Sequence, residues 1–563
     1  MSRSTQCALL VSTVLCCSSV QAAVNFRTVA LSGQTAPDGS NAVLGTFSTP
    51  LLNNAGETTF QAKFATNIGT ATTSTDTAIW FEHNSNLVLA AREGTQAPGA
   101  PLGATFSETF RLTGFNSASQ FAFQGTLSSG AGGVSGTNND GIWTNVGGAV
   151  SLLAREGALA SGAGGASFGP LEFPRLNEAG EIVFKGSLAA GAAANSNEGI
   201  WAFRNGALEL VAREGQPAPG APAGTHFGGS NLDLTSFSPP LISDDGSILF
   251  AANFGVGAIS TDRGIWSDRE GSLDLVLRTG DQAPGTPAGT KIAFIIDSSR
   301  INGLGQLAGY WQLSGGDVID NVNERGIWAE GNGPLELVAR SGDPAPGTAT
   351  GIVFDFLSPP SFNDAGKSAF YANLRGSNAE LNSNNNEGIW TNRSGGLSLV
   401  MREGDQAPGL PAGAVFSFNL VSARPQHNNL GQIKFPGFLR SGAGGVTTDN
   451  DGALWVTDTS GALQLIVREG NSFTVAPGDV RTVMSIGPNG LGESSELNDD
   501  GTLAFVLKFT DGSQGVFTAK VGVPEPTSFA MTMLAIYSLV GICNRRTKRN
   551  LCNACSVGDA FGG

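Results

Sequence analysis

The stretch Gly199–Gly220, GIWAFRNGALELVAREGQPAPG, decides the fold, because versions of it recur along almost the whole chain. It reads TAIWFEHNSNLVLAAREGTQAPG up to Gly99, GIWAEGNGPLELVARSGDPAPG up to Gly347 and GIWTNRSGGLSLVMREGDQAPG up to Gly409. A frame that returns with the same turns and the same apolar positions is the sequence signature of a repeat protein.

The tryptophans give the period of the repeat. They recur in steps of 58 to 65 residues, and Phe517 continues the series, so the unit is about 62 residues long. The seven positions are Trp80, Trp143, Trp201, Trp266, Trp328, Trp390 and Trp455. An Asn-x-x-Gly turn keeps the same phase at Asn53–Gly56, Asn177–Gly180, Asn302–Gly305, Asn363–Gly366, Asn428–Gly431 and Asn498–Gly501. Two units depart from this turn, since Asn116 is followed by Ser119 and Ser243 leads to Gly246.

Each unit reads as four short strands. The first carries Gly-Ile-Trp, and the second alternates, as in Leu208–Ala212, before it ends at Arg213. An Ala-Pro-Gly corner stops the second strand, because proline cannot donate to a ladder. A recurring Phe marks the third strand, and the fourth follows the Asn-x-x-Gly turn, as in Glu181–Phe184. Many four-stranded meanders in series predict an all-β fold, the β-propeller.

The two ends of the repeat region, residues 24–518, predict that the ring closes. Phe26–Ser32 reads as a second strand without its first, and Gly515–Thr518 reads as a first strand without the rest of its unit. Pairing them within one blade would complete the unit and remove two exposed edges. The length of the region predicts eight blades. A seven-bladed ring, a pair of smaller propellers and an open β array are the alternatives.

Composition narrows the classes of function. Charged residues make up 14% of the chain and the formal net charge is -15. This argues against nucleic acid as a partner, because phosphate binding needs clustered Lys and Arg. All six cysteines lie near the ends of the chain: Cys7, Cys16, Cys17, Cys543, Cys552 and Cys555. The repeat region therefore has neither disulfides nor cysteine-ligated metals.

Both ends of the chain read as targeting segments. Residues 1–22 have a positive start at Arg3, an apolar run and small residues before a cleavage site near Ala22, which is typical of a signal peptide removed by signal peptidase. After a linker at 519–526, an uncharged apolar run predicts a transmembrane helix at 527–543. Residues 544–563 form a tail with a basic cluster, which predicts that this end lies in the cytoplasm and the repeats outside.

The C-terminal arrangement resembles the PEP-CTERM sorting tail. The residues that carry the resemblance are Val523, Pro524, Glu525 and Pro526, then the apolar run, then Arg545 and Arg546. The resemblance implies processing by an exosortase, a membrane protease-transpeptidase, and a transient anchor in the inner membrane before release to a bacterial cell surface. The segments Asn363–Phe370 and Asn498–Phe505 resemble the NxxGxxxAF tandem-repeat family, which implies no biochemical activity.

Recurring residues are the first candidates for a binding site. A ring of arginines could bind anionic sugars or phosphate. We favour a structural role for them, because a residue present in nearly every unit usually solves a problem that every unit has. The arginines are Arg92, Arg155, Arg213, Arg278, Arg340, Arg402 and Arg468. The tryptophans could stack on sugars, but we expect them to fill the core.

The polar loops that precede Gly-Ile-Trp are candidate calcium sites. They are Thr137–Asp140, Asn195–Glu198, Asn382–Glu387 and Thr448–Asp451. Their oxygens could ligate calcium, but none has the full spacing of a calcium loop, and Asn and Asp also suit turns. We therefore expect no cofactor and no metal.

No catalytic constellation is visible in the sequence. His83, His226 and His427 stand at different points of their units, and no nucleophile elbow, P-loop or zinc spacing occurs. Tyr310-Trp311 and Arg424–His427 break the repeat pattern. Either could mark a site, but we favour drift within one blade.

Two functions remain. The first is an exported structural or binding module of the cell surface or extracellular matrix, with extracellular polysaccharide as a partner. The alternative is an extracellular hydrolase or lyase that acts on polysaccharide. An enzyme should show a pocket lined by residues found in single blades, including at least two convergent acid–base groups.

Overall fold

The computed structural model describes residues 24–189, 197–228, 236–255, 262–331, 333–417, 424–488 and 495–522. One compact unit spans Asn25–Val521, and the other consists of the two ends of the chain. The expected signal peptide, PEP motif, apolar helix and basic tail all lie outside the described residues. In the described part, no helix is long and apolar enough to cross a membrane.

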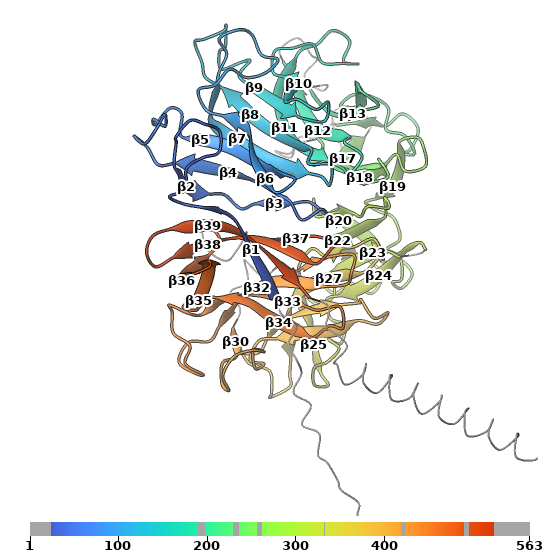
Figure 1. The fold of residues 1–563 in the computed structure, drawn as a ribbon. Coiled ribbons are helices and arrows are strands. Elements are labelled where there is room, and N and C mark those ends of the chain that lie inside the picture. Colours follow the sequence, from blue (N-terminus) through green and yellow to red (C-terminus); the bar gives the residue numbers. More distant parts are fainter. Residues whose placement is uncertain are drawn as a thin grey trace, which may run out of the picture. The chain divides into compact units, whose positions relative to one another are not determined.

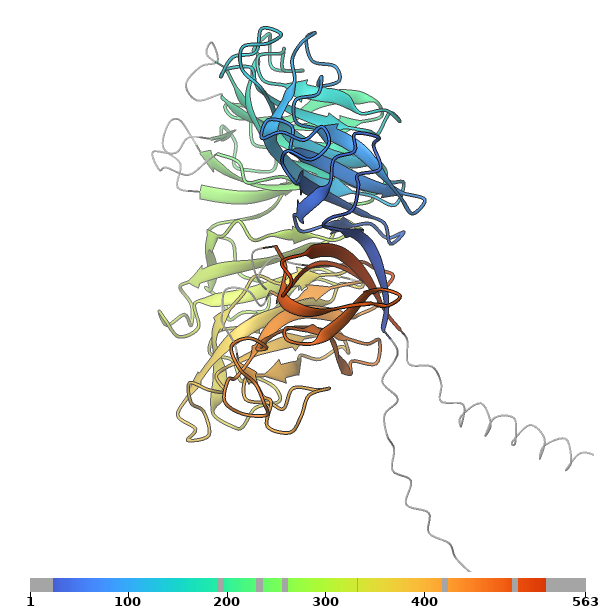
Figure 2. The same cartoon turned by 60° about the vertical axis from the view of Figure 1, so that its left-hand side comes forward.

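The described part of the chain is an all-β propeller with eight blades (Figures 1 and 2). Its thirty-nine strands form eight antiparallel sheets. Blade 1 contains β2 (Leu44–Phe47), β3 (Leu51–Leu52), β4 (Thr58–Phe64), β5 (Thr77–His83) and β6 (Asn86–Arg92). Blade 2 contains β7 (Phe106–Phe115), β8 (Phe121–Leu127), β9 (Asp140–Thr144) and β10 (Ser151–Arg155). Blade 3 contains β11 (Phe168–Leu176), β12 (Ile182–Leu188), β13 (Glu198–Arg204) and β14 (Ala207–Arg213).

The next three blades repeat this order. Blade 4 contains β15 (His226–Phe227), β16 (Leu241–Ile242), β17 (Ile248–Gly255), β18 (Asp262–Ser267) and β19 (Asp274–Arg278). Blade 5 contains β20 (Lys291–Ile295), β21 (Arg300–Ile301), β22 (Leu307–Ser314), β23 (Arg325–Glu330) and β24 (Leu335–Arg340). Blade 6 contains β25 (Ile352–Leu357), β26 (Ser361–Phe362), β27 (Ser368–Gly376), β28 (Glu387–Thr391) and β29 (Ser398–Arg402).

The last two blades complete the ring. Blade 7 contains β30 (Phe416–Ser417), β31 (Gln426–His427), β32 (Ile433–Leu439), β33 (Gly452–Thr457) and β34 (Leu463–Arg468). Blade 8 contains β35 (Ser472–Ala476), β36 (Asp479–Ile486), β37 (Ser495–Leu497), β38 (Thr502–Phe509) and β39 (Gln514–Val521), together with β1 (Val24–Leu31) from the start of the chain.

The predicted closure of the ring is confirmed. β1 is hydrogen-bonded beside β39 and forms the outer strand of blade 8, as Figure 1 shows for the two ends of the colour scale. The amide of Ser32 donates to the carbonyl oxygen of Gln514 at 2.8 Å. The end of β1 therefore faces the start of β39, so the two strands are antiparallel and the described chain begins and ends at the same edge.

The prediction of four continuous strands per blade needs a correction. In blades 1, 4, 5, 6, 7 and 8 the innermost strand is split into two strands that pair with the same neighbour. Proline explains several of these breaks, because it cannot donate to the ladder: Pro50, Pro240 and Pro360 each lie between the two halves. Blade 8 also adds a hairpin strand, β35, which the repeat did not predict.

The tryptophans lie in the core, where the repeat predicted them. Each is at most 1% exposed. In blade 3, Trp201 stacks on Phe184 with ring centroids 6.2 Å apart and meets the edge of Phe168 at 5.0 Å. The Gly of the motif is required by this packing, because a Cβ on Gly199 would come within 2.9 Å of the Trp201 ring.

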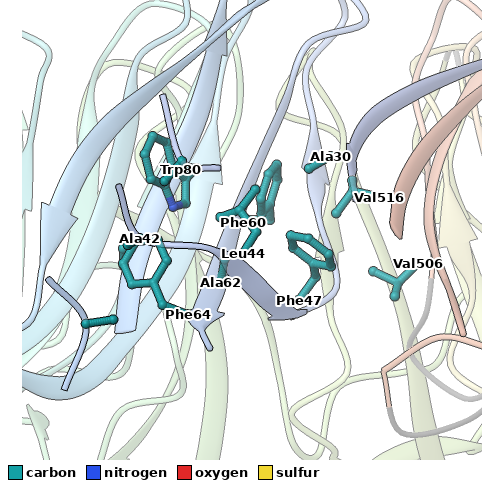
Figure 3. Packing of buried hydrophobic residues seen from close by; sticks show 13 residues of the cluster. Ala30, Ala42, Leu44, Phe47, Phe60, Ala62, Phe64, Trp80, Val506 and Val516 are labelled. Carbon is teal, nitrogen blue, oxygen red and sulfur yellow. The ribbon is translucent and has the colours of Figure 1, made fainter. Parts of the chain in front are cut away.

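The tryptophan also links successive repeats. Its indole nitrogen donates at 2.9 Å to a carbonyl oxygen in the corner of the preceding repeat, in five blades. Trp143, for example, donates to Pro98, and Trp390 donates to Pro346. Blade 8 packs on blade 1 through apolar side chains. Figure 3 shows Val506 and Val516 of blade 8 near Phe47 of blade 1.

Candidate functional site

The innermost strands surround the axis of the propeller, and we call the region that they enclose the axial channel. Neighbouring inner strands contact one another in the cyclic order β3, β7, β11, β16, β21, β26, β31, β37 and back to β3. Each of these strands leads into the Asn-x-x-Gly turn. The turns therefore form one mouth of the channel, and their recurring Asn lies at the axis.

Each Asn side chain makes two kinds of hydrogen bond. Its Oδ1 accepts from the amide four residues later at 2.8 to 3.0 Å, which closes its own turn. Its Nδ2 donates at 2.8 to 3.1 Å to the main-chain carbonyl oxygen at the same place in the next blade. We call this the asparagine ring. An amide side chain carries an acceptor oxygen and a donor nitrogen on one group, so a single Asn makes both bonds.

The asparagine ring has one gap. In blade 4 the position is Ser243, whose hydroxyl bonds within its own turn, to Asp245 and to the carbonyl oxygen of Ser247. The contact to blade 5 is instead a main-chain bond from Asp245 to Gly303 at 3.2 Å. Seven of the eight positions therefore hold the blades together through the side chain.

An acidic rim lies at the mouth, one residue after the ring. Here six main-chain amides donate to side-chain oxygens of the next blade at 2.6 to 3.1 Å. Four of the eight side chains at this position are carboxylates: Glu178, Asp244, Asp364 and Asp499. Burial among protein atoms, followed by the other three carboxylates, raises the pKa of Asp244. This mouth is therefore negative.

Deeper in the channel, the residue type changes from blade to blade. Two residues before the ring position stand Leu51, Gly114, Arg175, Leu241, Arg300, Ser361, Gln426 and Glu496. We call these eight residues the channel layer. Unlike Trp, Arg and Asn of the repeat, its charged members occur in only three of the eight blades, with Arg in blades 3 and 5 and Glu in blade 8.

The charged side chains of the channel layer influence one another across the channel. Glu496 of blade 8 accepts a hydrogen bond from Gln426 of blade 7 at 3.2 Å. Burial raises the pKa of Glu496, while Lys434 and Arg175 oppose this rise. Burial also lowers the pKa of Lys434 to about 8, against the effect of Glu496. The channel thus brings a buried acid and a buried base together.

The arginines of the channel are accessible to solvent yet surrounded by protein. The surface of Arg175 is exposed, but its pKa is lowered, mainly by burial. Burial also lowers the pKa of Arg300, followed by the nearby charges of Arg424 and Arg175. Exposure to water and a pKa lowered by burial are both expected for a side chain in a narrow channel that water can enter. Arg424, which precedes Gln426 by two residues, belongs to the segment Arg424–His427 that breaks the repeat pattern.

A cavity of about 600 Å³ lies between the inner strands of blades 8, 1 and 2. Its wall includes Leu51 of the channel layer and the side chains of Lys63 and Lys508. Both lysines lie near the ends of strands that run away from the acidic rim, so the cavity lies in the opposite half of the propeller. The positive charge of Lys63 is partly compensated by the carboxylates of Asp76 at 4.0 Å and Glu108 at 3.7 Å.

The recurring arginines do not line the channel. They end the outer strands, and in five blades their Nε donates at 2.7 to 3.1 Å to a carbonyl oxygen of the polar loop that precedes Gly-Ile-Trp. The Glu that follows accepts main-chain amides of the same loop, as Glu156 does from Asn139 at 3.2 Å. The geometry supports the structural reading of these arginines.

The same contacts bear on the calcium hypothesis. In the loops at Thr137–Asp140, Asn382–Glu387 and Thr448–Asp451, the guanidinium already engages the carbonyl oxygen of Asn138, Asn385 or Asn450. Part of Asn195–Glu198 lies outside the described residues. Within the ranges that the structure describes, no group of three or more His, Cys, Asp or Glu residues could hold a metal ion.

The remaining sequence candidates are dispersed. His83 contacts Ser119 at 3.0 Å, His226 is exposed on β15, and His427 is buried beside the asparagine ring. Trp311 stacks on Trp328 with centroids 5.4 Å apart, so this departure from the repeat belongs to the core.

The fold and the channel together define the class of protein: it is an eight-bladed β-propeller with a polar axial channel. The chain belongs to a family of unknown function, DUF7453, whose model matches residues 19–332 and 296–530. No curated protein matches the chain.

Several solved structures are similar at low identity. The β-propeller domain of the Trilobed protease from Pyrococcus furiosus matches with 9% identity over 85% of this chain and 95% of that chain, at a TM-score of 0.36. Pyrococcus horikoshii acylaminoacyl peptidase matches with 10% identity over 72% of this chain and 52% of that chain, at 0.33. Trypanosoma rangeli sialidase matches with 10% identity over 96% of this chain and 64% of that chain, at a TM-score of 0.25. The chain thus spans about half the length of the peptidase, and no activity follows from these likenesses.

Proposed function

We propose that the protein is an exported, exosortase-processed protein of the cell surface or extracellular matrix, in which the propeller is a binding module. The observation that carries the binding role is a contrast between two sets of residues. The repeated Trp, Arg and Asn bond within the fold, whereas the channel layer presents charged residues that only three of the eight blades supply. Residues that the fold does not use repeatedly are the ones available to a ligand.

Export and processing rest on the ends of the sequence. The signal-like residues 1–22, the PEP motif at Val523–Pro526 and the apolar run that follows are the features that support them. The ring is compatible with processing at both ends, because β1 begins at Val24 and β39 ends at Val521. Removal of both end segments would leave every strand of the ring in place.

Extracellular polysaccharide is the proposed partner. The test is a glycan array probed with the full chain, purified in mild detergent, followed by a turnover assay on every glycan that binds. We expect binding without turnover. An array with no bound glycan would contradict the module.

An extracellular polysaccharide hydrolase or lyase is the second candidate. The buried pair of Glu496 and Lys434 favours it, because acid–base catalysis requires such convergent groups. The turnover assay separates the two candidates. If new reducing ends or unsaturated sugars form with the parent protein and not with Glu496→Gln, the protein is an enzyme rather than a binding module.

A further inference from the structure

We propose that the axial channel binds an oxyanion (carboxylate, sulfate or phosphate) between Arg175, Arg300 and Arg424. We further propose that this oxyanion is the acidic group of an extracellular glycan. The choice of a glycan rests on the proposed function, whereas the anion site stands on the geometry alone.

The three arginines converge although they come from three different blades. Arg175 lies on β11 of blade 3, Arg300 lies on β21 of blade 5, and Arg424 precedes β31 of blade 7. These strands line one channel, and the charges of Arg175 and Arg424 both act on Arg300. Side chains from alternate blades can interact only if they point towards the axis.

These guanidinium groups have little compensation from the protein. Within the described part of the chain, the guanidinium groups of Arg175 and Arg424 have no hydrogen bond or ion pair, although the charge of Glu496 acts on Arg175. Arg300 donates only to the carbonyl oxygens of Ser298 at 3.4 Å and Ser299 at 3.1 Å. The one carboxylate of the channel layer, Glu496, is already engaged by Gln426 and lies near Lys434. The cluster therefore carries excess positive charge in a chain whose formal net charge is -15.

An oxyanion fits this arrangement chemically. Guanidinium groups bind carboxylate, sulfate and phosphate through paired N–H donors, and such charge-assisted bonds are the strong ones. An anion held among the three positive guanidinium groups in a partly desolvated channel also relieves the repulsion between these groups. Neutral sugars offer no such compensation.

The charge distribution also predicts the direction of entry. The acidic rim of Glu178, Asp244, Asp364 and Asp499 repels an anion at one mouth. The cavity of about 600 Å³, with Lys63 and Lys508 in its wall, lies in the opposite half. An acidic ligand therefore enters from the face away from the Asn-x-x-Gly turns.

The test is titration calorimetry on the full chain with three probes: tri-galacturonate as an acidic glycan, maltotriose as a neutral one, and inorganic phosphate. We expect tri-galacturonate and phosphate to bind and maltotriose not to bind. Arg175→Gln and Arg300→Gln should each weaken binding about tenfold or more, and Arg175→Lys should weaken it less, because it keeps the charge and loses the fork.

Two further variants serve as controls. Arg278→Gln removes one positive charge from the outer strand of blade 4 and should leave binding unchanged. Asp364→Asn removes one negative charge from the rim, where Asn429 and Asn54 stand in other blades, and should leave binding equal or tighter. Thermal unfolding of each variant shows that the ring is intact.

The outcomes separate the site from the proposed function. Glycan binding that is unchanged in both Arg→Gln variants keeps the binding module and overturns the channel site. Phosphate binding that depends on Arg175 and Arg300, without any glycan binding, keeps the anion site and overturns the glycan. Absence of binding by both anionic probes overturns the proposal as a whole.

Discussion

The side-chain amide of Asn498 donates a hydrogen bond to the carbonyl oxygen of Asn53 at 2.8 Å, although 445 residues separate the two. Asn53 makes the same bond to Asn116, and the series continues around the axis. The Asn498 bond therefore joins the last blade to the first. The ring is closed twice, at the axis by this contact and at the outer edge by β1 and β39.

Loss of the Asn498 donor should open the axial closure. Asn498→Asp keeps the acceptor of the turn but cannot donate to Asn53, and it buries a charge next to Asp499. We expect the free energy of unfolding to fall by about 2–4 kcal/mol, measured by urea denaturation. Asn384→Asp, the same change in an exposed loop, is the matched control. Equal effects of the two changes would show that the contact does not hold the ring.

Filling the gap in the asparagine ring should stabilise the protein. Ser243→Asn supplies the missing donor towards the carbonyl oxygen of Asn302, where the other blades have one. A new buried hydrogen bond predicts a gain of about 0.5–1.5 kcal/mol, read as a higher urea midpoint. A lower midpoint would mean that blade 4 needs the local bonds of Ser243 more than a link to blade 5.

The tryptophan core predicts a large cost for truncation. Trp201→Ala removes a ring that is 0% exposed and should lower the free energy of unfolding by about 3–5 kcal/mol. Leu159→Ala, at a side chain that is 75% exposed, should change it by less than about 0.5 kcal/mol. A cost for Trp201→Ala as small as that of the control would contradict the core assignment.

His427 predicts a pH dependence of stability. Burial lowers its pKa to about 4, with the nearby charge of Arg393 acting in the same direction and a bond to the backbone of Lys367 opposing it. The unfolded chain protonates at about 6.5, so it binds the proton first as the pH falls. The contribution of His427 to the free energy of unfolding is therefore fully present above about pH 6.5. It declines as the pH falls from about 6.5 to about 4, by about 3 kcal/mol in total.

Replacement of His427 isolates this contribution. The other seven blades carry Leu, Ile or Phe at the same position, so His427→Leu fits the site. The variant should lose less stability than the parent between pH 6.5 and 4, measured by urea denaturation at each pH. His226→Gln, at an exposed histidine, is the control. Parallel pH curves for parent and His427→Leu would refute the assignment.

Features that every blade shares could be predicted from the sequence, because repetition exposes them. The period of Trp80 and its counterparts gave the blades, and the incomplete units at Phe26–Ser32 and Gly515–Thr518 gave the closure. The Asn-x-x-Gly motif was recognised only as a turn, since its second role, donation to the next blade, depends on how blades are placed in space.

The channel layer could not be predicted for the opposite reason. Arg175, Arg300 and Glu496 share a position relative to the turn, but most blades have an uncharged residue there, so a search for recurring residues passes over them. Their proximity arises only when the ring closes. A comparison of the units at that one position, looking for variation, would have been the available signal.

The proposed function is tested most directly by the mass of the protein's C-terminus in bacterial cells with and without the exosortase. We predict that the wild-type cells release a body that has lost residues 527–549, because the apolar run is removed with its basic cluster. In cells without the exosortase, the body should keep these residues and stay with the membrane. A body that retains residues 527–549 in both strains would contradict sorting and leave a propeller without exosortase processing.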